Sequence, residues 1–220
     1  AASITVSGVG EIDVAQIGGA GSYYLTGTVA EIAALPEALL EVGFIINDTV
    51  ANIAAADTAL TESDYLEATV VTDTGANVAN ADLLITGVAA EVHITDTIDT
   101  TTLTTLQGLA LNLYDIAEVE DTIANLTGLA NGALSAGSQD IDTITVTDAT
   151  ITQAQATALV TAGADANAAN VVFSFSDEHD NLTPAFVENA QAVEITDTIT
   201  VDEAGSMFEL NEALTITIAD

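Results

Sequence analysis

The chain has 220 residues, no Lys or Arg, 34 Asp or Glu and a formal net charge of −34 at pH 7, while 49% of its residues are hydrophobic. This apolar content is typical of a folding chain, because acidic disordered segments are poor in hydrophobic residues. Without Lys or Arg the chain lacks the side chains that neutralise nucleic-acid phosphates, form Schiff bases or clamp phosphoryl groups, which excludes those classes of function.

The absence of cysteine excludes a disulfide framework and a thiolate metal site. No run approaches the roughly 18 uninterrupted apolar residues of a membrane span. Ala1 leads directly into a strand-like run rather than a basic signal-peptide start. We therefore expect a mature or excised piece of a secreted protein, with no insertion into membranes and no nucleic-acid partner.

Strand-like runs recur along the whole chain, and most of them end in Asp. The ten runs are 4–8, 23–27, 44–48, 69–73, 92–96, 117–121, 144–148, 173–177, 193–197 and 216–220. Their last residues are spaced by roughly 19 to 29 positions, which is typical of repeat arrays. Apolar side chains stand two and four residues before most of these ends, as in Phe44-Ile-Ile46 and Val92-His-Ile94, with Thr69 and Ala117 as exceptions. This alternation predicts strands with one buried face and one hydroxyl-rich face.

Alanine-rich segments between the runs are predicted to form short helices, at 49–56, 122–134, 152–161, 184–190 and 201–210. The phrases that begin at Asp48, Asp73 and Asp121 all read Asp-Thr-x-Ala-Asn-apolar. An Asp or Thr at such a position can accept hydrogen bonds from the first free N–H groups of a helix.

A strand, a cap, a helix and a return fit a parallel crossover, which is right-handed in nearly all known cases. We therefore predict an α/β or mainly β repeat protein, a right-handed parallel solenoid of about ten strand–helix or strand–loop coils. Nothing in the composition divides it, so residues 1–220 are predicted to form a single repeat domain, a segment or subunit of a larger assembly.

The Asp-Thr-x-Ala-Asn phrases and the Thr-Asp-Thr strand ends resemble the Ala/Thr/Asp-rich repeats of giant secreted prokaryotic surface proteins, which include adhesins and S-layer proteins. The resemblance implies an extracellular structural component of a surface layer, adhesin or filament, commonly dependent on calcium. The chain lacks the Gly-Gly-x-Gly-x-Asp nonapeptide of RTX proteins, so the calcium geometry of that group is not transferred.

The aspartates that end the strand-like runs, here named the aspartate column, are the main candidate site. The column comprises Asp48, Asp73, Asp96, Asp121, Asp148, Asp177 and Asp197. Stacked in register, neighbouring carboxylates would repel by about 1 kcal/mol in water. Two interpretations are compatible: helix capping at each turn, or a row of calcium sites that bridge adjacent coils.

Further acidic groups extend the metal hypothesis. Glu178 and Asp180 join Asp177 in the densest cluster of candidate ligands, ahead of the pairs Asp140/Asp142 and Asp202/Glu203, and a solvated acidic loop is the alternative. Oxygen ligands suit Ca²⁺, so His179 is expected to be a bystander rather than a zinc ligand. His93 is expected on the polar face of its strand.

No arrangement predicts catalysis, since neither His lies in a recognisable nucleophile context. The leading hypothesis is a structural chain that self-associates head to tail with further repeats or identical subunits. The alternative is a binding module for ice or glycans that uses the hydroxyl stripe Thr5, Ser7, Thr72, Thr95, Thr145, Thr147, Ser174, Ser176 and Thr196. Asn47, Asn125 and Asn181 head Asn-x-Thr sequons, which are candidate glycosylation sites but also arise by chance in Thr-rich sequence.

Overall fold

The computed structural model describes residues 2–6, 10–15, 24–81, 89–109, 114–135, 139–164, 171–200, 202–203, 205–206 and 215–218. Contacts within the chain divide it into two compact units. One comprises Ala1–Asp96 with Thr104–Asp115, and the other comprises Thr97–Leu103 with Ile116–Asp220. The single repeat domain over residues 1–220 stays a prediction.

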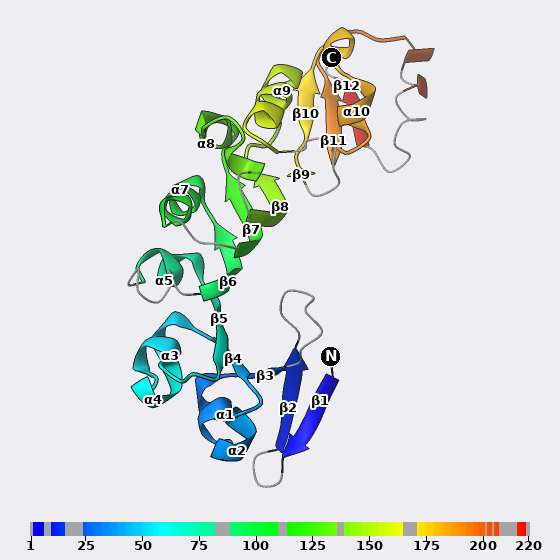
Figure 1. The fold of residues 1–220 in the computed structure, drawn as a ribbon. Helices are drawn as coiled ribbons and strands as arrows, with labels where there is room; N and C mark the ends of the chain where they lie inside the picture. Colours follow the sequence, from blue (N-terminus) through cyan, green and yellow to red (C-terminus); the bar gives the residue numbers. More distant parts are fainter. Residues whose placement is uncertain are drawn as a thin grey trace. The chain divides into compact units, whose positions relative to one another are not determined.

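Short strands alternate with short helices along the described chain (Figure 1). The strands are β1 (Ala2–Val6), β2 (Gly10–Ala15), β3 (Tyr24–Gly27), β4 (Phe44–Asp48), β5 (Leu66–Asp73), β6 (Ala89–Ile98), β7 (Tyr114–Asp121), β8 (Gln139–Val146), β9 (Val171–Val172), β10 (Phe175–Asp177), β11 (Ala192–Ile195) and β12 (Thr215–Ile218). The helices are α1 (Val29–Ala33), α2 (Glu37–Leu40), α3 (Val50–Ala55), α4 (Thr58–Thr61), α5 (Gly75–Ala79), α7 (Thr100–Gly108), α8 (Ile123–Gly128), α9 (Gln153–Thr161) and α10 (Pro184–Val187), with 3-10 turns η1 (Ala133–Ser135) and η2 (His179–Asn181).

The strands pair in chain order. A nine-stranded sheet runs from β1 to β9, and its seven strands β3 to β9 are parallel. Strands β10, β11 and β12 form a second sheet, in which both pairs are parallel. The predicted α/β fold with parallel strands joined by helical crossovers is thus confirmed at this level.

The first predicted rung is wrong. Strand β1 pairs antiparallel with β2, a strand that the repeat pattern did not predict, and Ile4 lies opposite Ile12. Strand β2 is antiparallel to β3 as well. Only residues 7–9 separate β1 from β2, far fewer than a parallel crossover needs. The predicted run 173–177 does not continue the first sheet. The last strand of that sheet, β9, ends at Val172, and β10 belongs to the second sheet. A solenoid of ten coils is therefore not confirmed, and the run ends Gly8 and Asp220 lie outside the described residues.

Most residues two and four positions before the predicted strand ends are buried, as predicted, but the alternation is not strict, because Ile45 in β4 and Val70 in β5 are buried as well. Phe44 and Ile46 are 0% exposed, and the corresponding residues of the following strands are buried as well: Val92, Ile94, Ile144, Val146, Phe173, Phe175, Val193 and Ile195. Thr69 is also buried, although polar. Strand β7 departs from the pattern, because Ile116 and Val119 are buried and the small Ala117 is not.

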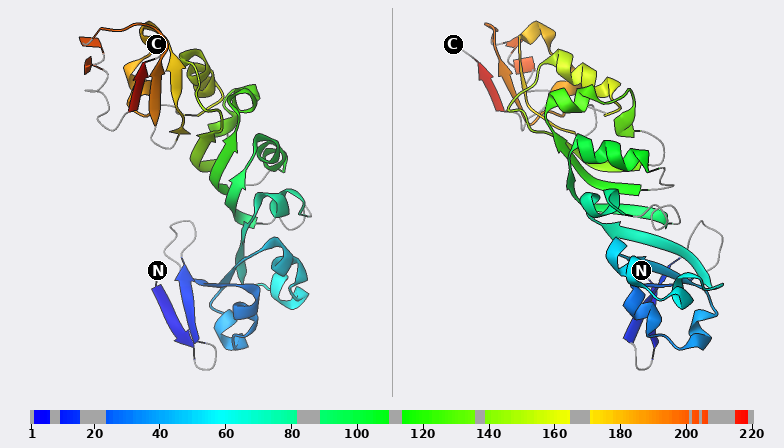
Figure 2. Two further views of the ribbon diagram at one scale, coloured as in Figure 1. Left: turned by 180° about the vertical axis from the view of Figure 1, so that it is seen from behind. Right: turned by 90° about the vertical axis from the view of Figure 1, so that its left-hand side faces the viewer.

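The helices contribute the other side of the core. In most of them the fourth helical residue is fully or almost fully buried: Ile32, Ile53, Val78, Leu103, Leu126, Ala156 and Val187. This position is the apolar residue that follows Asn in the repeated phrase. In the first unit, α1, α3 and α5 lie on one side of strands β3 to β5, as the views from the front, back and side agree (Figures 1 and 2).

The predicted helices are correct in place but several are too long. Helix α3 lies within the predicted range 49–56, and α9 lies within 152–161. Helix α8 ends at Gly128 and is followed by η1, so the predicted helix at 122–134 is interrupted. Helix α10 ends at Val187 rather than at 190. In the range 201–210, residues 202–203 and 205–206 are helical and the others lie outside the described residues.

Candidate functional site: the aspartate column

Each carboxylate of the aspartate column accepts a hydrogen bond from the first N–H of a helix that lies 18 to 25 residues earlier in the chain. The Val29 N–H, the first of α1, donates to Asp48 Oδ2 over 3.0 Å. The same bond recurs from the first helical residue to the next column aspartate at every later step: Val50 to Asp73, Gly75 to Asp96, Thr100 to Asp121, Ile123 to Asp148, Gln153 to Asp177 and His179 to Asp197. A strand and the helix that follows it are called a strand–helix unit, which is a smaller piece than the two compact units described above. We name this bond the cross-unit bond, since it joins one strand–helix unit to the next.

Four of the seven carboxylates also organise their own turn. In Asp48, Oδ1 accepts the Thr49 N–H at 2.8 Å and the Asn52 side-chain amide at 2.7 Å. Asp73, Asp121 and Asp177 repeat this pair of bonds with the next residue's N–H and with an Asn four positions later: Asn77, Asn125 and Asn181. These four are named double clamps. Asp96, Asp148 and Asp197 are named single clamps, because within the described residues only the cross-unit N–H donates to each.

The predicted capping role is therefore confirmed, but the helix that a column aspartate caps is that of the preceding unit. Most strand–helix units cap their own helix with a threonine instead, whereas α7 is capped by Asp99. The hydroxyls of Thr28, Thr49, Thr74, Thr122 and Thr152 each accept the N–H of the third helical residue at 3.3 Å. The Asp-Thr pair thus satisfies two successive helix N-termini, which otherwise carry unpaired donors.

The helix N-termini stabilise the ionised carboxylates. Partial burial raises the pKa of Asp121, but hydrogen bonds from Thr100, Asn125 and Thr122 outweigh it and hold that pKa below its ordinary value. For Asp177, burial likewise raises the pKa, but hydrogen bonds from Asn181, Gln153 and Glu178 outweigh this effect, and the pKa is lowered overall. In a chain without Lys or Arg, backbone and amide N–H groups supply the partial positive charge that a salt bridge would otherwise provide.

The column offers calcium fewer oxygens than its sequence suggests. Both oxygens of each double clamp already accept N–H groups, which leaves room for few metal bonds. In a single clamp, one oxygen has no donor within the described residues. No group of three or more His, Asp or Glu side chains in the described part of the chain is placed to hold a metal ion. The row of calcium sites stays a prediction, and the single clamps fit it better than the double clamps.

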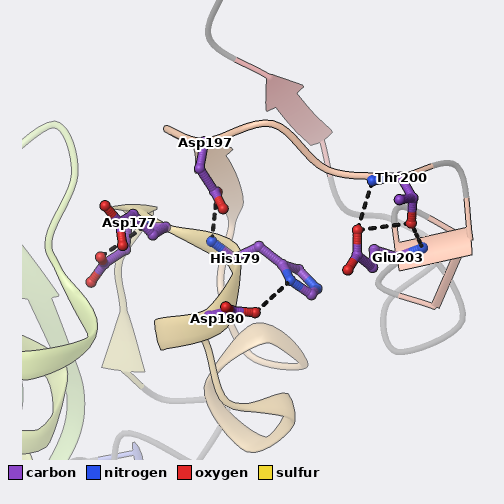
Figure 3. A network of polar contacts seen from close by, with 7 residues as sticks. Asp177, His179, Asp180, Asp197, Thr200 and Glu203 are labelled. Carbon is purple, nitrogen blue, oxygen red and sulfur yellow. Dashed lines mark hydrogen bonds and ion pairs between the residues drawn. The ribbon is translucent and has the colours of Figure 1, made fainter.

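The acidic cluster after β10 does not converge on one point. Glu178 is exposed, and its N–H donates to Asp177. The Asp180 side chain is 94% exposed and lies 3.5 Å from His179 Nδ1. Figure 3 shows the His179 ring between Asp180 and Glu203, while its backbone N–H points to Asp197. Bonds from the backbone and hydroxyl of Thr200, together with His179, lower the pKa of Glu203. Asp140, Asp142 and Asp202 are exposed as well.

The polar face of the sheets carries hydrogen bonds that the sequence did not predict. Glu118 accepts the hydroxyl of Thr145 at 2.6 Å and that of Thr97 at 2.8 Å. These two bonds lower the pKa of Glu118. Other cross-strand bonds join Thr72 to Asn47 and Ser176 to Glu194. Several hydroxyls of the predicted stripe are therefore already donated to neighbouring strands, while Ser7 and the side chain of Thr5 lie outside the described part.

His93 lies on this polar face, as predicted, and has acidic neighbours. Its Nδ1 is 3.4 Å from Asp115 Oδ2 and its Nε2 is 3.4 Å from Glu91 Oε2. The two carboxylates contact opposite ring nitrogens and do not converge on one atom.

The asparagines of the double clamps are the functional residues that sequence reasoning missed. The signal was present, because Asp and Asn are four positions apart in all four double clamps. Three of these pairs lie in the repeated Asp-Thr-x-Ala-Asn phrase, and the fourth, Asp177 with Asn181, lies outside it.

No protein-family model matches the sequence, and no curated protein matches it either. Among the described residues, no helix is both long and apolar enough to cross a membrane.

Proposed function

We propose that the chain is a structural segment of an extracellular assembly, a surface layer, adhesin or filament, whose strand–helix units stack as a parallel β/α solenoid from β3 onward. The observation that carries this proposal is the cross-unit bond, in which a backbone N–H donates to a column carboxylate seven times along the chain. A bond that joins each strand–helix unit to the next serves the growth of an array.

The residue types that recur along the chain support the same structural role. The residues that recur most regularly are those that build the turn: the column Asp, the capping Thr and the buried apolar residue of the helix. These positions stabilise neighbouring units rather than converge on a reacting atom. The chain is accordingly proposed to be non-enzymatic, secreted and self-associating with further repeats or identical subunits.

We also propose that divalent cations stabilise the folded chain, because its negative charges repel one another. A formal charge of −34 without any Lys or Arg opposes the compact state by self-repulsion. Ca²⁺ favours oxygen ligands, and the uncommitted oxygens of Asp96, Asp148 and Asp197 are its best candidates within the column. Exposed carboxylates such as Glu178 and Asp180 would add weaker binding.

The test is electron microscopy and size-exclusion chromatography of the purified chain, in millimolar calcium and in EDTA. We expect concentration-dependent assemblies in calcium. A monomer under every condition would contradict self-association.

A melting curve in the same two buffers tests the cation separately. A ligand bound only by the folded chain stabilises it by about 2.7 kcal/mol at 100 times its Kd. The triple variant Asp96→Asn, Asp148→Asn, Asp197→Asn should lose most of the calcium-induced rise in Tm, whereas the exposed-site control Asp64→Asn should keep it. An unchanged Tm in wild type would remove calcium from the proposal.

A further inference from the structure

The three Asn-x-Thr sequons differ sharply in the structural role of their asparagine. Asn125 lies in helix α8 and Asn181 in the turn η2, whereas Asn47 lies in strand β4. An N-glycan is attached to the side-chain nitrogen Nδ2, so the bonds that this atom already makes decide whether a glycan disturbs the fold.

At two sequons Nδ2 is part of the fold. Asn125 Nδ2 donates to Asp121 Oδ1 at 2.7 Å, and Asn181 Nδ2 donates to Asp177 Oδ1 at 2.8 Å. Both bonds belong to double clamps. A glycan on either nitrogen would remove one of its two hydrogens and place a sugar beside the turn. The sequon of Asn125 is further committed, because the Thr127 hydroxyl donates to the Ile123 carbonyl at 2.7 Å.

Asn47 differs in the bonds of its amide. All three sequon asparagines are exposed, but the amide of Asn47 is held by its oxygen, since Oδ1 accepts the Thr72 hydroxyl at 2.8 Å. Within the described residues Nδ2 has no partner. Asn47 is the exposed residue of β4, whereas Phe44, Ile45 and Ile46 before it are at most 2% exposed. The Thr72 hydroxyl therefore holds the Asn47 amide by Oδ1, and Nδ2 is the end of the amide that this bond leaves unused.

We propose that Asn47 is the N-glycosylation site of this chain and that Asn125 and Asn181 are not modified. The donor would be a diphosphate-linked sugar. A bond forms between Asn47 Nδ2 and C1 of the sugar, the bond from C1 to the diphosphate oxygen breaks, the diphosphate leaves with the electron pair, and the amide releases one proton. The proposal rests on the extracellular location proposed above. It places one glycan at the exposed position of β4 and leaves every clamp intact.

The test is secretion of the full chain from a yeast host, followed by enzymatic removal of N-glycans in ¹⁸O water. This treatment converts a glycosylated Asn to labelled Asp, which mass spectrometry locates. Trypsin has no site in a chain without Lys or Arg, so the peptides are made with proteases that cleave at Asp or Glu. We expect label at residue 47 and less than a tenth as much at residues 125 and 181.

Matched variants make the assignment specific. Asn47→Gln should remove the glycan mass, while Asn125→Gln and Asn181→Gln should retain it. Thr49→Ser keeps both the sequon and the hydroxyl that caps α3, and should stay glycosylated. A secreted chain without any glycan, or label at Asn125 or Asn181 equal to that at Asn47, would overturn the proposal. The assembly and calcium experiments use unmodified bacterial protein, so failure here leaves the structural function standing.

Discussion

The double clamps and the single clamps differ in their place relative to the strand and in the residues that follow. Each double-clamp aspartate is the last residue of its strand, whereas Asp96 lies inside β6 and Asp148 and Asp197 come after β8 and β11. After Asp48, Asp73 and Asp121, the capping Thr is the next residue and Asn stands four positions after the Asp. After Asp96 the cap is Asp99, and after Asp148 it is Thr152, so the helix begins later. The local bonds are then absent from the described residues, yet the cross-unit bond remains. The join between units is kept where the turn changes, which marks it as the constant part of the repeat.

The largest effect should distinguish the two groups directly. Asp73→Ala removes three hydrogen bonds from a carboxylate that is 8% exposed, and we expect it to lower the free energy of unfolding by about 3 kcal/mol. Asp148→Ala removes the cross-unit bond alone and should cost about 1.5 kcal/mol. Urea unfolding at neutral pH measures both.

Loss of one negative charge needs its own control. Asp64→Ala removes an exposed carboxylate to which no described residue donates, and it should leave stability unchanged or slightly raised, because the chain is strongly acidic. Equal losses for Asp73→Ala and Asp148→Ala would contradict the distinction between the groups.

Acid should weaken the double clamp of Asp121. The pKa of Asp121 is lowered in the folded chain, so below its ordinary value of 3.8 the unfolded state binds more protons than the folded state. The stability that Asp121 contributes is therefore complete above that value and is lost as the pH falls through its lower folded pKa. Acidification also relieves the repulsion of the other carboxylates, so the comparison must be with Asp121→Asn. Between pH 5 and pH 2.5, stability should fall more in wild type than in Asp121→Asn; parallel curves would refute this.

The asparagine of a double clamp should contribute less than the aspartate. Asn77→Ala removes one amide bond to Asp73 and should cost about 1 kcal/mol in urea unfolding. In the Asp73→Ala background the same change should cost much less, because the acceptor is already absent. An equal cost in both backgrounds would assign the role of Asn77 to something other than this bond.

Period-two alternation predicted the buried side chains Val92 and Ile94 of β6, but in β4 it missed Ile45, which is buried between Phe44 and Ile46. It did not place β2, since Gly10–Ala15 ends in no Asp and was not aligned with the repeat. It also missed the shift in β7, where Ile116 and Val119 are buried and strict alternation would have buried Ala117.

The candidate site divides in the same way between local and distant partners. The caps by Thr49 and Thr74 follow from adjacent sequence and were predictable. The cross-unit bonds were not, because each joins residues 18 to 25 positions apart, a spacing that the sequence does not link to any particular N–H. The role of Glu118 was hidden for the same reason, since its partners Thr97 and Thr145 lie on other strands.

The smallest effect concerns that polar face. Thr145→Val removes the shorter of the two bonds to Glu118, but it adds a side chain that favours strands, so the net loss of stability should be only about 0.5 kcal/mol. Thr143→Val is the matched control on the same strand, because no described residue bonds to its hydroxyl, and it should be neutral or stabilising. The sharper measurement is the titration of Glu118 by NMR. The Thr145 bond is the largest cause of its lowered pKa, so Thr145→Val should raise that pKa towards its ordinary value while Thr143→Val leaves it in place. If both variants leave the Glu118 titration unchanged, the hydroxyl–carboxylate bonds across this face do not form in solution.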